Sequence, residues 1–251
     1  MVKLICKLFA VVMLGGIVNP VLGDDHASVP ATNIWTAQNI EFKDGQMAAF
    51  RQGLAELMAS DIGKEFPGTV YFNWILSDGN ARATHSLINS FPSTQAWSDW
   101  NTKFFTMAAS GGNAASKWMQ LYGNSIESTS TSTLKVAQSW GNTNEMQGPT
   151  VWVPFYTEDL ASFISDFSDY MKTPTGKGFK GAVAIHQCIA CGEQTANAGF
   201  TVNHESPASF DEWYSDGQYS KDFSEWVSKA NEKADFTGNW MIARLDSYLP
   251  E

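Results

Sequence analysis

The sequence predicts an α+β protein in which one βαββαβ unit occurs twice. Three observations support this fold class. Short β-prone segments alternate with apolar stripes of helical period. Similar segments recur at a spacing of roughly 110 residues, the length of a small domain. With 16 Phe, 10 Trp and 7 Tyr, the 251-residue chain has ample apolar area to build a core.

The first repeat is expected to begin with a β-prone run at 34–37 and a helix whose apolar residues share one face. Two strands, at 69–76 and 84–89, should then form a hairpin, because Asp78-Gly79 is a typical hairpin turn. Aromatic helices follow, and a strand at 132–137 closes the repeat. The helical apolar residues are Met47, Phe50, Leu54, Leu57 and Met58 in the first helix, and Trp97, Trp118 and Met119 in the later ones.

The second repeat is expected to follow the same order, from a strand at 151–154 to a closing strand at 239–245. Its first helix has Thr157 or Asp159 available as a cap. Paired strands are predicted at 182–188 and 199–204, with a loop through Gly192 between them. The helical apolar residues are Leu160, Phe163, Ile164, Phe167 and Met171, followed by Trp213, Phe223, Trp226 and Val227.

Two polar segments bear on where the repeats are divided. The Ser/Thr-rich stretch 125–133 is either a flexible linker or a loop entering the closing strand, and we favour the loop, because the matching place in the second repeat is a strand. Asn, Gly and Pro gather between 141 and 148, which favours a junction there. The predicted units are therefore residues 24–144 and 145–251.

A βαββαβ unit is the ferredoxin-like fold, with both helices on one face of the sheet. The opposite face is left uncovered, so two units can bury these faces against each other as a pseudo-dimeric α/β barrel. In the order of its hairpins and of the Pro-Ser or Pro-Ala segments before Trp97 and Trp213, the chain resembles the dimeric α/β-barrel superfamily of antibiotic-biosynthesis-monooxygenase-like and stress-responsive proteins.

That resemblance implies a cavity that holds a small apolar or aromatic compound or a haem. Haem-binding relatives use a histidine from the helical layer. The helices predicted here contain none, so we expect no haem and no other cofactor.

The N-terminus reads as a secretory signal at 1–23, with Lys3 and Lys7 before an apolar run at 8–18 and cleavage after Gly23. The alternative is a retained membrane anchor. Removing the signal leaves 14 basic and 26 acidic residues, a net charge of −12. Such a surface disfavours nucleic acid and anionic membranes as partners. We expect an extracytoplasmic protein, periplasmic or secreted, either a monomeric pseudo-dimer or a homo-oligomer.

The segment His186-Gln187-Cys188-Ile189-Ala190-Cys191 has three interpretations. Cys188 and Cys191 can form a structural disulfide, which an exported protein favours. They can form a redox-active pair, although no helix begins at the first cysteine to stabilise a thiolate. Alternatively, His186, Cys188, Cys191 and His204 can bind a metal ion.

Polar residues on the predicted hairpins are the candidates for ligand binding. If strand alternation brings them to one face, they would line a pocket with aromatic walls, as small-molecule sites require. The set comprises Asn73, His85, Asn89, His186, Asn203 and His204. The nine tryptophans at matching places in the two repeats are expected mainly in the core, with stacking on a ligand as an alternative for those on the sheet.

Three functions remain open on this basis. The first is an exported, non-catalytic protein that binds a small, partly apolar ligand in the barrel cavity. The second is a cofactor-free monooxygenase-like or isomerase-like enzyme with a histidine as general base, which needs a buried histidine. The third is an interaction protein whose acidic surface meets a cationic partner. The catalytic residues, if any, are not identified by the sequence.

Overall fold

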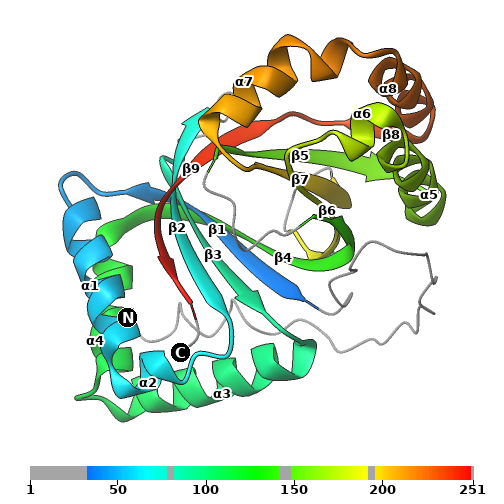
Figure 1. The fold of residues 1–251 in the computed structure, drawn as a ribbon. Helices are drawn as coiled ribbons and strands as arrows, with labels where there is room; N and C mark the ends of the chain where they lie inside the picture. Colours follow the sequence, from blue (N-terminus) through cyan, green and yellow to red (C-terminus); the bar gives the residue numbers. More distant parts are fainter. Residues whose placement is uncertain (1–32, 78–81, 142–147, 192–195, 250–251) are drawn as a thin grey trace.

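The structure is a computed structural model that describes residues 33–77, 82–141, 148–191 and 196–249. The strands form one strongly curved β-sheet, and two layers of helices cover its outer face at opposite ends of the molecule (Figure 1). We refer to residues 34–140 as the N-terminal half and to residues 150–248 as the C-terminal half. Each half contributes its own strands and its own helical layer.

The N-terminal half has the order strand, helices, two strands, helices, strand. Its 15-residue closing strand, β4, pairs with β1 over nearly the whole length of β1, from Phe42 opposite Ile126 to Ile34 opposite Lys135. The elements are β1 (Ile34–Phe42), α1 (Met47–Ala59), α2 (Asp61–Lys64), β2 (Thr69–Ser77), β3 (His85–Phe91), α3 (Thr94–Ser110), α4 (Ala114–Ser125) and β4 (Ile126–Trp140).

The C-terminal half repeats this order, except that its closing strand is interrupted. Both parts of that strand, β8 and β9, pair with β5. The elements are β5 (Thr150–Thr157), α5 (Leu160–Met171), α6 (Pro174–Lys177), β6 (Gly181–Ala190), β7 (Ala198–His204), α7 (Pro207–Ser215), the 3-10 turn η2 (Gly217–Tyr219), α8 (Lys221–Lys233), β8 (Ala234–Phe236) and β9 (Trp240–Tyr248).

The strands close into an eight-stranded antiparallel barrel. The order is β7-β6-β4-β1-β3-β2-β9-β5, and β5 pairs back with β7. Within the N-terminal half the strands follow the order β4-β1-β3-β2, and the corresponding strands of the C-terminal half follow β9-β5-β7-β6. The two seams join the halves reciprocally, because β4 pairs with β6 and β2 pairs with β9.

Each half has its own core between the sheet and its helices. In the N-terminal half Phe50 of α1 and Phe72 of β2 are fully buried, and Trp118 of α4 packs against Phe50. In the C-terminal half Phe155 of β5 and Phe163 of α5 lie with their ring centroids 4.5 Å apart. Burying such aromatic side chains is the main apolar contribution to stability, at about 25 cal/mol per Å².

The predicted mixed α+β class and barrel are confirmed, and so are the predicted strands and helices of both halves. Asp159 caps α5 by accepting a hydrogen bond from the Ser162 backbone, whereas the Thr157 hydroxyl donates to the Lys233 carbonyl. The loop favoured at 125–133 is wrong: Ser125 ends α4 and residues 126–133 belong to β4, because β1 supplies them with a pairing partner.

Several sequence predictions lie outside the described residues. They are the signal at 1–23, most of the turn at 77–80, most of the junction at 141–148 and the loop through Gly192. The boundary between units at 144 and 145 stays a prediction. Among the helices that the structure describes, none combines the length and the apolar character needed to cross a membrane.

Candidate functional site

Strand alternation divides the six predicted ligand-binding residues into two groups of three. One group points into the barrel and the other points toward the helices. Asn73, for example, follows Phe72, which belongs to the core under α1, so Asn73 faces the interior. The interior group is Asn73, His186 and Asn203, and the helix-facing group is His85, Asn89 and His204. The expectation of one shared polar lining is therefore wrong.

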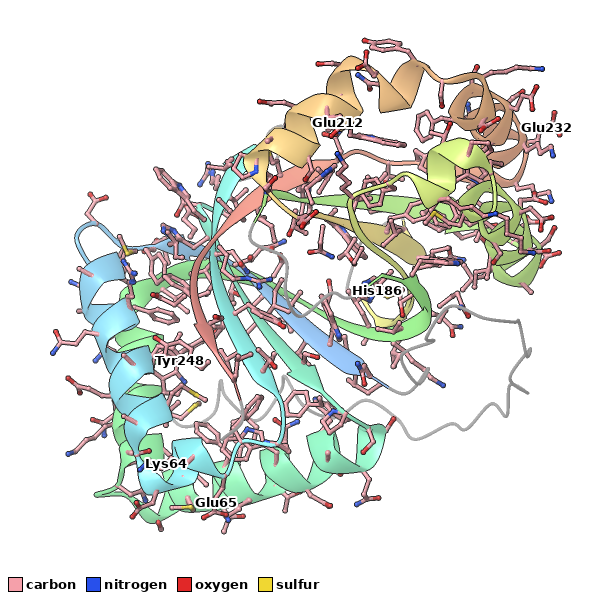
Figure 2. The ribbon with its side chains drawn as sticks, viewed as in Figure 1. Lys64, Glu65, His186, Glu212, Glu232 and Tyr248 are labelled. Atoms are coloured by element: carbon pink, nitrogen blue, oxygen red, sulfur yellow. A yellow bond between two sulfur atoms is a disulfide. The ribbon has the colours of Figure 1, made fainter. Side chains whose placement is uncertain are left out.

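His186 is the central residue of the interior group. It is fully buried on β6 and lies between two tryptophans, with ring centroids 4.8 Å from Trp35 of β1 and 5.6 Å from Trp152 of β5. These tryptophans open the two halves at corresponding places in the chain. The Nε2 atom of His186 lies 2.8 Å from the Thr201 hydroxyl on β7. Figure 2 shows His186 inside the barrel, between the two helical layers.

Burial sets the charge of His186. Because the imidazole is removed from water, burial lowers the pKa of His186 to about 3. The ring is therefore neutral at neutral pH, and one of its nitrogens carries a hydrogen while the other accepts. If Nε2 donates to Thr201, then Nδ1 is the acceptor; in the other tautomer Nδ1 is the donor.

Several buried polar atoms in the barrel interior have no hydrogen-bond partner among the described residues. His186 Nδ1 is one, and Nδ2 of Asn203 is another, although Oδ1 of Asn203 accepts from the Thr150 hydroxyl at 2.8 Å. Leaving such a group without a partner costs about 1–3 kcal/mol, so each calls for a water or a ligand. The interior set is Trp35 Nε1, Ser139 Oγ, His186 Nδ1 and Asn203 Nδ2.

A second interior group lies where β2 meets β9. Arg244 of β9 stands over the ring of Tyr71, 4.0 Å from its centroid, and is paired in register with Asn73. Asn73 is buried and donates to the Ser86 hydroxyl at 3.2 Å. Burial lowers the pKa of Arg244, although the guanidinium remains charged at any physiological pH. The interior thus contains a cation as well as neutral polar groups.

The helix-facing residues sit among aromatic side chains. His85 stacks on Phe72 with ring centroids 5.3 Å apart, and its Nδ1 lies 2.8 Å from the Thr84 hydroxyl. Asn89 donates to the Thr36 hydroxyl at 3.2 Å. These contacts all lie within the N-terminal half, and a role of either residue in ligand binding stays a prediction.

His204 is buried against Phe179 and Phe210 below α7. Burial lowers its pKa to about 4, and the Ser209 backbone offsets this only in part. Like His186, it is therefore a neutral group inside the protein at neutral pH.

Cys188 and Cys191 form a disulfide at the end of β6, with Cα atoms 6.0 Å apart. The alternative metal set is not assembled, because His186 points into the barrel while His204 points toward α7. Among the described residues no group of three or more potential ligands converges. A helix-borne haem ligand is also missing from the described part of the chain: His85, His186 and His204 all lie on strands.

Thr201 and Arg244 were not among the predicted site residues, and Trp35 and Trp152 were predicted to contact a ligand only as an alternative to core packing. The alternation of side chains along a strand could have predicted which face of its strand Trp35 occupies, and likewise for Trp152. Only the order of strands around the ring, however, brings β1, β5, β6 and β7 together about His186. Arg244 had no local signal, since a single arginine in a strand is ordinarily a solvent-facing residue.

No family model and no curated protein matches the chain. Among solved structures, a candidate monooxygenase from Lactobacillus acidophilus superposes with a TM-score of 0.62 at 10% identity, over 87% of this chain and 96% of that one. A candidate monooxygenase from Fusobacterium nucleatum gives 0.57 at 12% identity, over 88% and 95%. An anthrone oxidase-like protein gives 0.56 at 7% identity, over 89% and 95%. These likenesses show the fold alone, a mixed α+β fold with an eight-stranded antiparallel barrel.

Proposed function

We propose that this chain is an exported binding protein that holds a small, partly apolar molecule inside its barrel, beside His186. The observation that carries the proposal is the set of four buried polar atoms without partners in the barrel interior. Buried polar groups in folded proteins are nearly always satisfied, so these four atoms are the groups that a bound molecule would contact in the barrel interior.

The chemistry of these atoms restricts what binds there. Trp35 Nε1 and Asn203 Nδ2 are donors only, whereas His186 Nδ1 and Ser139 Oγ can donate or accept. A molecule that satisfies the set must therefore present at least two acceptors, such as carbonyl or hydroxyl oxygens. The rings of Trp35 and Trp152 pack against the His186 imidazole, so a molecule bound beside it would meet aromatic faces, which suits a planar or partly apolar compound better than a sugar-sized polar one.

The architecture that supports this proposal is a tandem of ferredoxin-like repeats acting as a pseudo-dimer. The two halves share one strand order and exchange pairings at two reciprocal seams, as two related units would. Export is proposed from the N-terminal sequence and is consistent with the disulfide between Cys188 and Cys191.

Native mass spectrometry of the purified mature protein tests the binding proposal. We expect a mass above that of the polypeptide, and we expect denaturing conditions to release the excess as a small organic compound. The variant Asn203→Leu removes one donor and should lose the compound, whereas Asn89→Leu alters an amide on the helix side and should retain it. If every form has the polypeptide mass, and if metabolite mixtures produce no thermal shift, the proposal is refuted.

The second candidate function is a cofactor-free monooxygenase-like or isomerase-like enzyme. The observation that favours it is a neutral, buried histidine whose Nδ1 can accept a proton in the tautomer in which Nε2 donates to Thr201. The same burial limits it, because a base with a pKa of about 3 lies about four units below neutral pH, and this adds about 5 kcal/mol to a full proton transfer.

The pH dependence of turnover tests the enzyme. An activity that depends on neutral His186 should persist from pH 8 down to about pH 4 and disappear in His186→Phe. An activity that falls near pH 6.5 would indicate a solvated histidine instead, and retention in His186→Phe would exclude this residue as the base.

A further inference from the structure

A groove on the outer side of the barrel lies apart from the interior site. Its volume is about 250 Å³. It runs between α1, the short α2 turn and the end of β9, and Figure 2 shows Lys64 and Tyr248 on this side of the molecule. The lining residues are Ala55, Met58, Ala59, Gly63, Lys64, Phe66, Gly68, Tyr248 and Leu249.

The walls of the groove are apolar. Ala55, Met58 and Ala59 are three and four positions apart, so they form one stripe of α1. Phe66 forms the floor and is buried, whereas Leu249 is 62% exposed. A leucine left this far in water at the edge of an apolar groove gains from any apolar molecule that covers it.

Lys64 supplies the only charge among the lining residues. Within the described part of the chain its ammonium makes no ion pair, whereas its neighbour Glu65 is neutralised by Lys103. Tyr248 adds a hydroxyl. Burial, and then the nearby Asp246 carboxylate, raises the pKa of Tyr248, so this group stays protonated and able to donate. Two donors therefore stand beside an apolar surface, in a protein whose net charge is −10.

We propose that this groove binds a small amphipathic carboxylate, with its carboxylate at Lys64 and Tyr248 and its apolar part between α1 and Leu249. The charge of Lys64 selects an anion, and the apolar stripe selects a chain or ring attached to it. The volume lies just below the about 300–1,000 Å³ of drug-sized sites, so a medium-length chain fits better than a long one.

Isothermal titration calorimetry with hexanoate, octanoate, decanoate and decanol, each below its aggregation limit, tests this site. Each added methylene should tighten binding by up to about fourfold until the groove is filled. Decanoate should bind more tightly than decanol by about two- to fivefold, the size of an exposed ionic contact.

Two pairs of variants locate the site. Lys64→Gln should remove the preference of decanoate over decanol, whereas Lys177→Gln, at the matching end of α6, should leave it unchanged. Ala55→Trp fills the groove from an exposed helix position and should weaken decanoate at least tenfold. Ala49→Trp, on a different face of α1, should not. His186→Phe should bind decanoate normally, because the groove is separate from the barrel interior.

The proposal is overturned if decanoate does not bind, if acid and alcohol bind equally, or if Ala55→Trp binds as well as Ala49→Trp. If instead the proposed binding in the barrel interior is wrong, native mass spectrometry gives the mass of the polypeptide alone, while decanoate still binds in calorimetry. The two proposals therefore fail separately.

Discussion

Replacing His186 by leucine should make the protein less sensitive to acid. In the folded state burial holds the pKa of His186 at about 3, while in the unfolded chain it returns to about 6.5. Between these two pH values His186 is protonated in the unfolded chain and neutral in the folded protein. Its neutral form therefore stabilises the fold above pH 6.5, and this contribution is lost progressively as the pH falls toward 3.

The size of the effect follows from the separation of the two pKa values. Protonation of His186 in the unfolded chain lowers the free energy of unfolding by about 2 kcal/mol at pH 5 and by about 3 kcal/mol at pH 4, relative to pH 7.5. His186 is fully buried, so solvent screening does not reduce these figures. His204 and His85, whose pKa values burial also lowers, add to the acid sensitivity of the wild type and remain in the variant.

The assay is urea unfolding followed by tryptophan fluorescence at pH 7.5, 6, 5 and 4. Leucine can shift the stability at pH 7.5 in either direction, so the quantity compared is the loss between pH 7.5 and pH 4. This loss should be about 3 kcal/mol smaller in His186→Leu than in the wild type. Thr201→Val, which removes the hydroxyl beside the ring but keeps the histidine, should retain the full loss. Equal losses in all three proteins would refute the buried, neutral assignment.

Three further perturbations have defined outcomes. Reducing the Cys188–Cys191 disulfide should lower the free energy of unfolding by about 2 kcal/mol, the value that the loop-entropy relation gives for so short a loop. Urea unfolding with and without reductant measures this loss. A variant with serine at both positions should match the reduced protein and should not respond to reductant. Asn113→Ala should cost about 1 kcal/mol, because Asn113 caps α4 reciprocally with Ser116; Asn113→Asp should be near neutral, and an equal loss in both would argue against the cap. Phe155→Ala should cost about 3–5 kcal/mol because the ring is fully buried among aromatic neighbours, and a loss below about 1 kcal/mol would contradict that packing.

Elements with a strong local period could be predicted from the sequence. The stripe of Phe163 and Phe167 on α5 and the cap at Asp159 are contacts within one helix, and both are present. The hairpin strands β2 and β3 are likewise specified by nearby residues. For such elements the chain neighbours decide the conformation, so a single sequence is sufficient.

The faces of the strands could not be predicted in the same way. In this barrel both faces are buried, one by helices and one by the opposite wall, so the usual polar-out pattern is absent. His85 is paired with Trp74, and Asn73 is paired with Ser86, in adjacent positions of the same hairpin. His85 nevertheless points toward the helices, whereas Asn73 points into the barrel. The prediction of a loop for the Ser/Thr stretch of β4 was wrong for a related reason. The strand conformation of this stretch depends on pairing with β1, about 90 residues earlier in the chain.

The reciprocal seams have a consequence for synthesis of the chain. Residues 34–140 emerge from the ribosome first. At that stage the outer edges of β2 and β4 have no neighbouring strand. Unpaired edges of this kind are templates for another chain. The tether between the halves keeps β6 and β9 at a high local concentration as soon as they emerge, so self-recognition outcompetes association between nascent molecules.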